Sequence, residues 1–243
     1  MEMERYLSQM AVKEIFPSGQ KIIESSSVVV VGMGGTGSAI AEVMVRMGVK
    51  KITIVDYDTI ENSNLNRQAM YRESDIGLKK VDVAKAELLK INNYVSVESV
   101  DQKLISSNAE GILSKADIIM DGTDNYDARH VLNVASVNLN IPWIFSAVEG
   151  TYGYVKAILP GKTSCLSCFE YPDKGEGISC TVQGVLPSAV RAISSLACSI
   201  ALKVLMDKET YGDLIYLDVW KPLLEVMQIP RNKECRVCGT KKD

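Results

Sequence analysis

The stretch that decides the fold is Ser27-Val28-Val29-Val30-Val31-Gly32-Met33-Gly34-Gly35-Thr36-Gly37. Its β-branched first half, residues 27–31, predicts a short buried strand. The glycines after it predict a tight turn, and the spacing of the apolar residues that follow predicts a helix over 35–47. Glycines let the backbone approach a phosphate closely, and a helix N-terminus offers free N–H groups to an anion. The stretch therefore predicts a nucleotide-binding turn whose candidate binding residues are Gly32, Gly34, Gly35 and Gly37.

An acidic residue follows the next predicted strand. Residues 51–55 have a strand pattern that ends at Asp56, which lies 19 residues after Gly37. A carboxylate at this place can accept hydrogen bonds from a ribose hydroxyl. The glycine turn and the acid alone would favour an NAD-dependent oxidoreductase, and a glycine turn without a ligand is the plainer alternative.

Strand and helix patterns alternate beyond this unit. Further strands are expected over 95–100, 118–120 and 143–147, with helices before and between them, the first over 79–91. Such alternation requires crossover connections and predicts an α/β fold with a doubly wound, mostly parallel sheet of the Rossmann type. The ligand of such a sheet is expected at the carboxyl ends of its strands.

The pattern changes after about Gly150. A strand is expected over 151–159 and a long apolar helix over 186–206. An antiparallel pair of strands, joined near Pro222, is expected over 211–220 and 223–229. We expect a single domain over 1–243, with a nucleotide-binding half over 1–150 and a second, cysteine-clipped half over 151–243.

The composition excludes several classes of protein. The chain has 243 residues, of which 47% are hydrophobic and 23% charged, and these proportions exclude disordered and low-complexity chains. With 27 basic and 30 acidic residues, the net charge of −3 weighs against a broad nucleic-acid-binding face. The helix expected over 186–206 is interrupted by Arg191, Lys203 and several serines, which favours a packed helix over a membrane span. The charged N-terminus has no apolar signal core, so we expect a cytoplasmic protein.

Four of the six cysteines form two C-x-x-C pairs, Cys165–Cys168 and Cys235–Cys238. A reducing compartment favours metal ligands over disulfides, and four thiolates suit a closed, tetrahedral, structural Zn²⁺ site. Because 66 residues separate the pairs, such a site would clip the end of the chain to its middle. A redox pair and free thiols are the alternatives. Cys198 lies among apolar residues of the long helix and is expected in the core.

Three further motifs occur from Asp56 onward. They are D-x-D-x-I-x-x-S-N-L-N-R-Q over 56–68, I-G-x-x-K over 76–80 and D-x-T-D-N over 121–125. Together with the glycine turn they resemble the E1-like activating enzymes, which comprise the ThiF/MoeB group and the related archaeal activators of ubiquitin-like modifiers. The resemblance covers about residues 5–239, and the joint pattern is highly specific although each motif alone is weak.

This resemblance implies an enzyme that uses ATP and Mg²⁺ to adenylate the C-terminal glycine carboxylate of a small ubiquitin-like sulfur-carrier protein. It implies that Gly35 approaches the ATP phosphates, that Asp56 holds the ribose and that Asp124 helps to hold Mg²⁺. Contacts with the triphosphate are implied for Asn64, Arg67 and Lys80, and Gln68 and Asn125 complete the candidate binding set. A zinc site at the four paired cysteines and a carrier-binding role for residues 151–243 are implied as well.

The residues themselves agree with this chemistry. Adenylation expels pyrophosphate, so preorganised cations and a metal must stabilise the charge that develops in a water-poor cleft. The attacking carboxylate is already ionised at neutral pH, so no general base is needed in a chain with one histidine, His130. Taken singly, Arg67 and Lys80 could be solvated surface charges, and Asp124 could cap a helix that begins near Asn125.

Cys180 stands unpaired in a turn-rich stretch before the long helix. An exposed loop cysteine with a lowered pKa can act as a nucleophile. In the resembling enzymes a matching cysteine bonds covalently to the carrier in some members and is dispensable in others, so Cys180 is a candidate catalytic residue with both outcomes open. The sequence ends shortly after the second cysteine pair, and we expect no attached rhodanese-like or ubiquitin-fold domain.

One position departs from the family pattern. Arg5-Tyr6-Leu7-Ser8-Gln9 resembles an R-Y-x-R-Q segment whose second arginine reaches across a homodimer interface to the partner's ATP, and here that position is Ser8. Either another cation supplies the contact, with Arg5 and Lys13 as candidates, or adenylation is weaker, or the substrate differs. The resemblance implies a homodimer, although the sequence has no direct marker of one.

The sequence leaves three other functions open. One is an adenylating dehydratase that acts on a modified tRNA base and shares the nucleotide motifs. Another is a nucleotide-binding scaffold that has lost catalysis, and the third is an NAD-dependent oxidoreductase. For the activating enzyme that the resemblance implies, neither a membrane nor a nucleic acid is expected as a partner.

Overall fold

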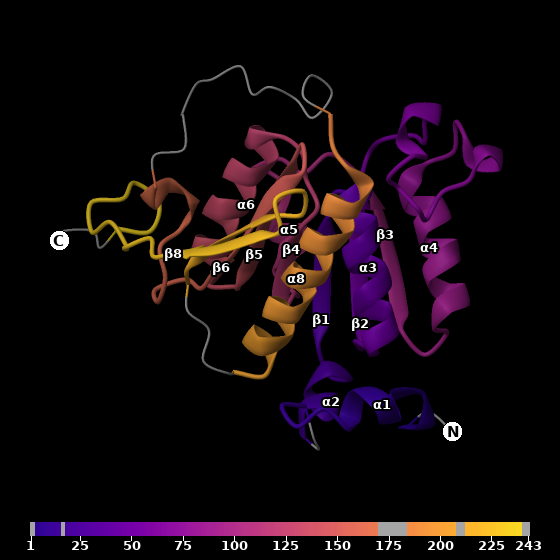
Figure 1. The fold of residues 1–243 in the computed structure, drawn as a ribbon, viewed down its shortest axis with the longest axis horizontal. Coiled ribbons are helices and arrows are strands. Elements are labelled where there is room, and N and C mark those ends of the chain that lie inside the picture. The colour runs from indigo at the N-terminus through magenta and orange to yellow at the C-terminus, as the bar shows by residue number, and fades with distance from the viewer. Residues whose placement is uncertain (1–2, 16–17, 170–183, 208–211, 240–243) are drawn as a thin grey trace.

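The computed structural model describes residues 3–15, 18–169, 184–207 and 212–239. Within these residues eight strands form one sheet, in the order β3-β2-β1-β4-β5-β6-β7-β8 (Figure 1). The strands are β1 (Ser27–Val31), β2 (Lys51–Asp56), β3 (Ser96–Asp101), β4 (Ile118–Asp121), β5 (Trp143–Glu149), β6 (Tyr152–Ile158), β7 (Leu214–Asp218) and β8 (Leu223–Met227).

The described helices are α1 (Leu7–Met10), α2 (Ser18–Ile23), α3 (Gly35–Met47), α4 (Lys80–Ile91), α5 (Ala109–Leu113), α6 (Tyr126–Leu139) and α8 (Pro187–Leu205). Short 3₁₀ turns are η1 (Met3–Tyr6), η2 (Asn62–Asn64), η3 (Glu73–Asp75) and η4 (Leu166–Cys168). These bounds lie close to the ranges expected from the sequence.

The first five strands in chain order pair in parallel, and β6, β7 and β8 add antiparallel ladders at one side. The predicted fold class, a mostly parallel doubly wound sheet with antiparallel C-terminal strands, is therefore confirmed. Strand β1 lies between β2 and β4, so the chain reverses its direction of winding there. Such a switch point leaves a crevice beyond the carboxyl ends of the strands, where ligands of this architecture bind.

Both faces of the sheet are covered at β1, which explains why this strand is a continuous run of valines. Val28 and Val30 belong to the core cluster beneath α3, α4 and α8, and Val29 and Val31 belong to the cluster beneath α5 and α6. Successive side chains of a strand point to opposite faces, so an uninterrupted apolar run is what a doubly covered strand needs. In Figure 1, α3 and α8 cover the near face of the sheet and α6 lies behind it.

Helix α8 is long and apolar enough to cross a membrane, by length and composition only. In this structure it packs against α3 and against strands β5 and β6. Its residues Ala189, Ile193, Ala197 and Ala201 are fully buried. This placement is that of a core helix, as the polar interruptions in the sequence predicted.

Candidate functional site

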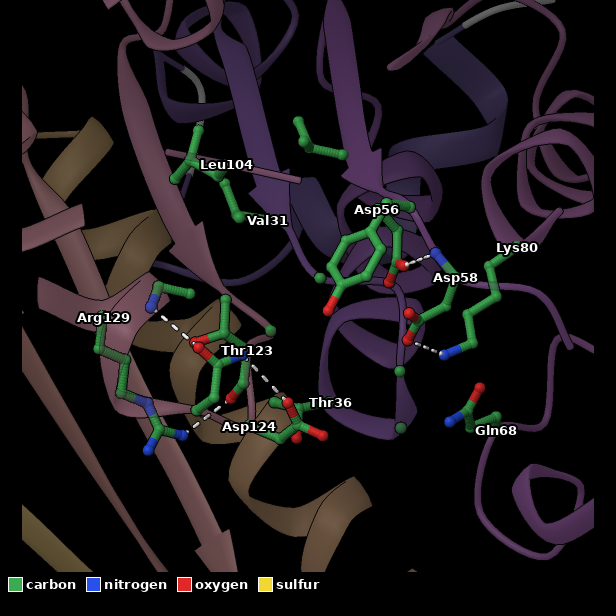
Figure 2. A pocket seen from close by; sticks show the side chains of 18 of the residues that line it. Val31, Thr36, Asp56, Asp58, Gln68, Lys80, Leu104, Thr123, Asp124 and Arg129 are labelled. Atoms are coloured by element: carbon green, nitrogen blue, oxygen red, sulfur yellow. Dashed lines mark hydrogen bonds and ion pairs between the residues drawn. The ribbon is translucent and has the colours of Figure 1, made fainter. Parts of the chain in front are cut away.

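A pocket opens beyond the carboxyl ends of β1, β2 and β4 (Figure 2). Its walls come from the glycine turn, the segment after β2, the approach to α4, and the β4–α6 connection. Nine residues predicted to bind the nucleotide line it: Gly32, Gly34, Gly35, Asp56, Arg67, Gln68, Lys80, Asp124 and Asn125. The topology therefore brings together residues that are up to 93 positions apart in the sequence.

Three glycines of the turn, Gly32, Gly34 and Gly37, have two different surroundings. A Cβ on Gly34 would meet nothing nearer than Gln68 Nε2 at 3.7 Å, so this glycine is open toward the pocket. Gly32 has φ +87°, and a Cβ there would lie 2.6 Å from the carbonyl oxygen of Gly122. A Cβ on Gly37 would overlap the carbonyl oxygen of Gly32. Gly32 and Gly37 are therefore required by close backbone packing between β1, α3 and β4, and Gly37 does not line the pocket.

Asp56 holds the glycine turn as well as facing the pocket. Its Oδ2 accepts a hydrogen bond from the backbone N–H of Met33 at 2.6 Å, and its Oδ1 accepts one from the backbone N–H of Asp58 at 2.8 Å. Asp56 is buried. Each carboxylate oxygen has a second lone pair, so these bonds leave acceptor capacity for a ribose hydroxyl.

Lys80 is buried, which rules out a solvated surface charge. Its ammonium forms an ion pair with Asp58, with 2.9 Å between Nζ and Oδ2, while the Asp58 carboxylate stays half exposed at the pocket (Figure 2). The backbone N–H of Lys80 also donates to the carbonyl of Asp58 at 3.1 Å. The motif residue Asp58, two positions after Asp56, thus fixes the beginning of α4 and supplies the counter-charge of the lysine.

Arg67 lines the pocket in a half-buried position. Its Nη1 donates to the carbonyl of Ser63 and to the side-chain oxygen of Asn66, both at 3.0 Å. Asn64 does not line the pocket, and its side-chain oxygen accepts the backbone N–H of Glu61 and so caps η2. Asn64 therefore shapes the turn that carries Arg67.

Asp124 is exposed at the pocket and does not cap α6. The N-cap is Asn125, whose side-chain oxygen accepts the backbone N–H of Ala128 at 2.9 Å. The suggestion that Asp124 could serve as the helix cap is therefore wrong. With the capping role filled by its neighbour, the Asp124 carboxylate is available to the pocket.

Sequence reasoning missed Arg129, which also lines the pocket. Its Nη2 donates to the carbonyl of Thr123 at 2.8 Å, and its Nε lies 3.5 Å from Oδ2 of the fully buried Asp121. Burial raises the pKa of Asp121 above its ordinary value, against the opposing charge of Arg129. The pair anchors the loop that carries Asp124, and its only signal in the sequence was an arginine in the second turn of the helix.

The four paired cysteines form one cluster. Their sulfur atoms all lie within 4.8 Å of one another, with 3.6 Å between Cys165 and Cys235 and 3.2 Å between Cys168 and Cys238. Tetrahedral zinc with Zn–S bonds of about 2.3 Å places its sulfurs about 3.8 Å apart, so the donor set and its spacing fit a metal ion. Burial opposes ionisation of Cys238, but hydrogen bonds from Cys168 and Cys165 lower its pKa to about 7.

Asn133 of α6 supports the first cysteine pair. Its side-chain oxygen accepts the backbone N–H of Leu166 at 2.9 Å, and its Nδ2 donates to Ser167 Oγ at 3.0 Å and lies 3.7 Å from Cys165 Sγ. Asn133 is fully buried and lies one helical turn after Arg129. Helix α6 therefore joins the cysteine cluster to the pocket.

Two further predictions concern Cys180 and the N-terminal segment. Cys180 lies outside the described residues. The N-terminal segment with Ser8 lies at the opposite end of the sheet in Figure 1, where Arg5 donates to the carbonyl of Ile91 at 2.8 Å and Lys13 is exposed. Any contact of Arg5 or Lys13 with a nucleotide would have to be made to another subunit.

The fold and the pocket together define a class: an α/β protein of the doubly wound type with a glycine turn, a buried lysine and a pocket-facing aspartate at its switch point. The ThiF family model matches residues 6–237. The chain therefore belongs to the ThiF family.

Relatives with curated names support this membership. The chain is 34% identical over 241 residues to the sulfur carrier protein ThiS adenylyltransferase of Bacillus subtilis, covering 98% of this chain and 72% of the relative. It is 35% identical over 247 residues to the sulfur carrier protein adenylyltransferase of Thermus thermophilus, covering 98% and 91%. Among solved structures, Escherichia coli MccB with ATP has a similar fold, with a TM-score of 0.81 and 24% identity over 91% of this chain and 69% of that one.

Proposed function

We propose that this chain binds ATP with Mg²⁺ and adenylates the C-terminal glycine carboxylate of a small ubiquitin-like or sulfur-carrier protein, releasing pyrophosphate. The single observation that carries this proposal is the convergence of Arg67, Lys80 and Asp124 on the pocket beside the glycine turn. The names of the relatives, both adenylyltransferases of sulfur carriers, supply the substrate class.

The pocket offers what the reaction needs. The carboxylate oxygen attacks the α-phosphorus, the bond between the α-phosphorus and the bridging oxygen breaks, and pyrophosphate leaves with the electron pair. Lys80 and Arg67 would stabilise the charge that develops on the triphosphate oxygens, because both cations are held by the fold before the substrate arrives. Asp124 would hold Mg²⁺, which supplies further charge neutralisation when bound.

The other pocket residues would hold the nucleotide. Gly34 and Gly35 leave room for phosphates at the beginning of α3, and Asp56 would accept the ribose hydroxyls. Gln68 and Asn125 would complete the polar lining. No general base is part of this scheme, since the attacking group is already ionised.

The second half of the chain completes the proposal. Residues 151–243 would bind the carrier, and Zn²⁺ at the four paired cysteines would tie the end of the chain to the sheet. Cys180 would act on the activated carrier in a covalent route, or be dispensable. A homodimer and a cytoplasmic location also belong to this proposal.

The experiment that tests it is an intact-mass measurement. The protein is incubated with ATP, Mg²⁺ and small Gly-Gly-ended proteins from the same source, and each is weighed. A gain of one AMP by one of them supports the proposal. Preferred binding of NADH over ATP would instead identify an oxidoreductase, and a gel shift with tRNA at physiological salt would favour the tRNA-modifying dehydratase.

A second candidate function rests on Ser8. Where the resembling enzymes have an arginine, this chain has a small hydroxyl that brings no charge to a neighbouring subunit's nucleotide. A nucleotide-binding scaffold without catalysis would show tight ATP binding and no AMP transfer to any Gly-Gly-ended protein.

A further inference from the structure

The two peptide groups that flank Met33, at the centre of the glycine turn, are each held by a hydrogen bond. Met33 lies between Gly32 and Gly34 and is fully buried. Its N–H donates to Asp56 Oδ2 at 2.6 Å, and its carbonyl oxygen accepts the hydroxyl of Tyr71 at 2.7 Å. A peptide group is planar, so the Tyr71 bond to the Met33 carbonyl sets the direction of the Gly34 N–H, and the Asp56 bond fixes the plane that precedes it.

Tyr71 belongs to the segment that carries the phosphate-facing side chains. Its backbone N–H donates to the carbonyl of Gln68 at 3.1 Å, and the backbone N–H groups of Gln68 and Arg67 both donate to the carbonyl of Asn64. Residues 64–71 therefore form one hydrogen-bonded turn. Gln68 is buried, and it points into the pocket from the wall opposite Asp124 in Figure 2.

The Tyr71 bond is made in a dry environment. Tyr71 is only 5% exposed, and burial, followed by the charge of Asp56, raises its pKa above its ordinary value. The phenol therefore stays protonated and acts as a donor. Without that donor the Met33 carbonyl would be buried with one partner fewer, and water has no ready access to replace it.

We propose that Tyr71 is a positioning residue that sets the distance between the glycine turn and the turn of Arg67 and Gln68. The inference rests on the proposed function, because it assigns these two turns to opposite sides of the same triphosphate. Tyr71 itself does not line the pocket and would act through Met33 and Gln68.

The test compares Tyr71→Phe with Ser136→Ala. The control loses a bond of the same kind and length, since the buried Ser136 hydroxyl donates to the carbonyl of Ile141 at 2.7 Å near the far end of α6. The melting temperature and the dissociation constant of a non-hydrolysable ATP analogue with Mg²⁺ are measured for both variants. Tyr71→Phe is expected to bind about 10-fold more weakly, and Ser136→Ala as tightly as wild type.

A double-mutant cycle separates positioning from general loosening. In a Gln68→Ala background, Tyr71→Phe is expected to weaken binding by less than about 3-fold, because the side chain that it positions is gone. The inference would be overturned if the two substitutions weakened binding of the analogue independently, so that their fold-changes multiplied. It would also be overturned if Tyr71→Phe bound the analogue with wild-type affinity, or if Ser136→Ala lost as much affinity as Tyr71→Phe. Failure of the wild-type protein to bind the analogue would instead refute the proposed function on which the inference rests.

Discussion

Replacing Gly37 by alanine should destabilise the protein, although this glycine does not line the pocket. A Cβ at Gly37 would lie 2.8 Å from the carbonyl carbon of Gly32 and closer still to its oxygen. Carbon atoms pack at about 3.5–4.0 Å, so α3 and β1 would have to separate by at least about 0.7 Å. The atoms that would have to move are backbone atoms of two core elements, and they cannot rotate away.

The expected cost is about 3 kcal/mol or more, at the upper end of overpacking effects. For a chain of this size that corresponds to a fall in melting temperature of about 6–12 °C. The assay is thermal unfolding followed by circular dichroism. Gly34→Ala is the matched control, because its Cβ would find only a 3.7 Å contact. This control should melt within about 2 °C of wild type and yet bind ATP more weakly, because its methyl group enters the pocket. Wild-type stability of Gly37→Ala, or equal destabilisation of both variants, would refute the packing argument.

Three further substitutions test the roles of Asp124, Lys80 and Asn133. Asp124→Asn should lower AMP transfer at least about 100-fold at an unchanged melting temperature, since the side chain is exposed; an unchanged transfer rate in a quenched assay would count against its role. Lys80→Met should weaken ATP binding about 10-fold or more by calorimetry, because it removes a buried cation that faces the pocket. Wild-type affinity of this variant would exclude a contact between Lys80 and the phosphates. Asn133→Ala should lower zinc affinity about 10-fold to 100-fold in a chelator competition, because it removes the amide that supports Cys165 and Leu166; unchanged affinity would show that the thiolates alone hold the metal.

Most of the fold could be predicted because its signals are local and repeated. The valine run of β1, the glycine turn and the spacing of α3 fix one strand–turn–helix unit, and the same alternation recurs through β5. The handedness of crossover connections then leaves few arrangements of the sheet. The two Cys-x-x-Cys pairs likewise predicted that their four thiols lie together, because two such pairs in one chain are typical of a single structural metal site.

The sequence could not predict which residues of the site line the pocket and which support the backbone around it. The sequence does not distinguish Gly34, which is open to the pocket, from Gly37, which is packed on Gly32, because both satisfy the same motif. Which of Asp124 and Asn125 caps α6 depends on backbone angles at the end of β4. Arg129 was missed for a related reason, since its partner Asp121 lies in a different element and only tertiary packing joins them.

The central claim is that the pocket transfers AMP to a carboxylate of another protein, and ATP–pyrophosphate exchange measures this step most directly. The protein is incubated with ATP, Mg²⁺ and labelled pyrophosphate, with and without the carrier identified by intact mass. Label is expected to enter ATP only when the carrier ends in an intact Gly-Gly carboxylate, and Asp124→Ala is expected to abolish the exchange. Exchange at the wild-type rate in Asp124→Ala, or none with any Gly-Gly-ended protein despite tight ATP binding, would contradict it.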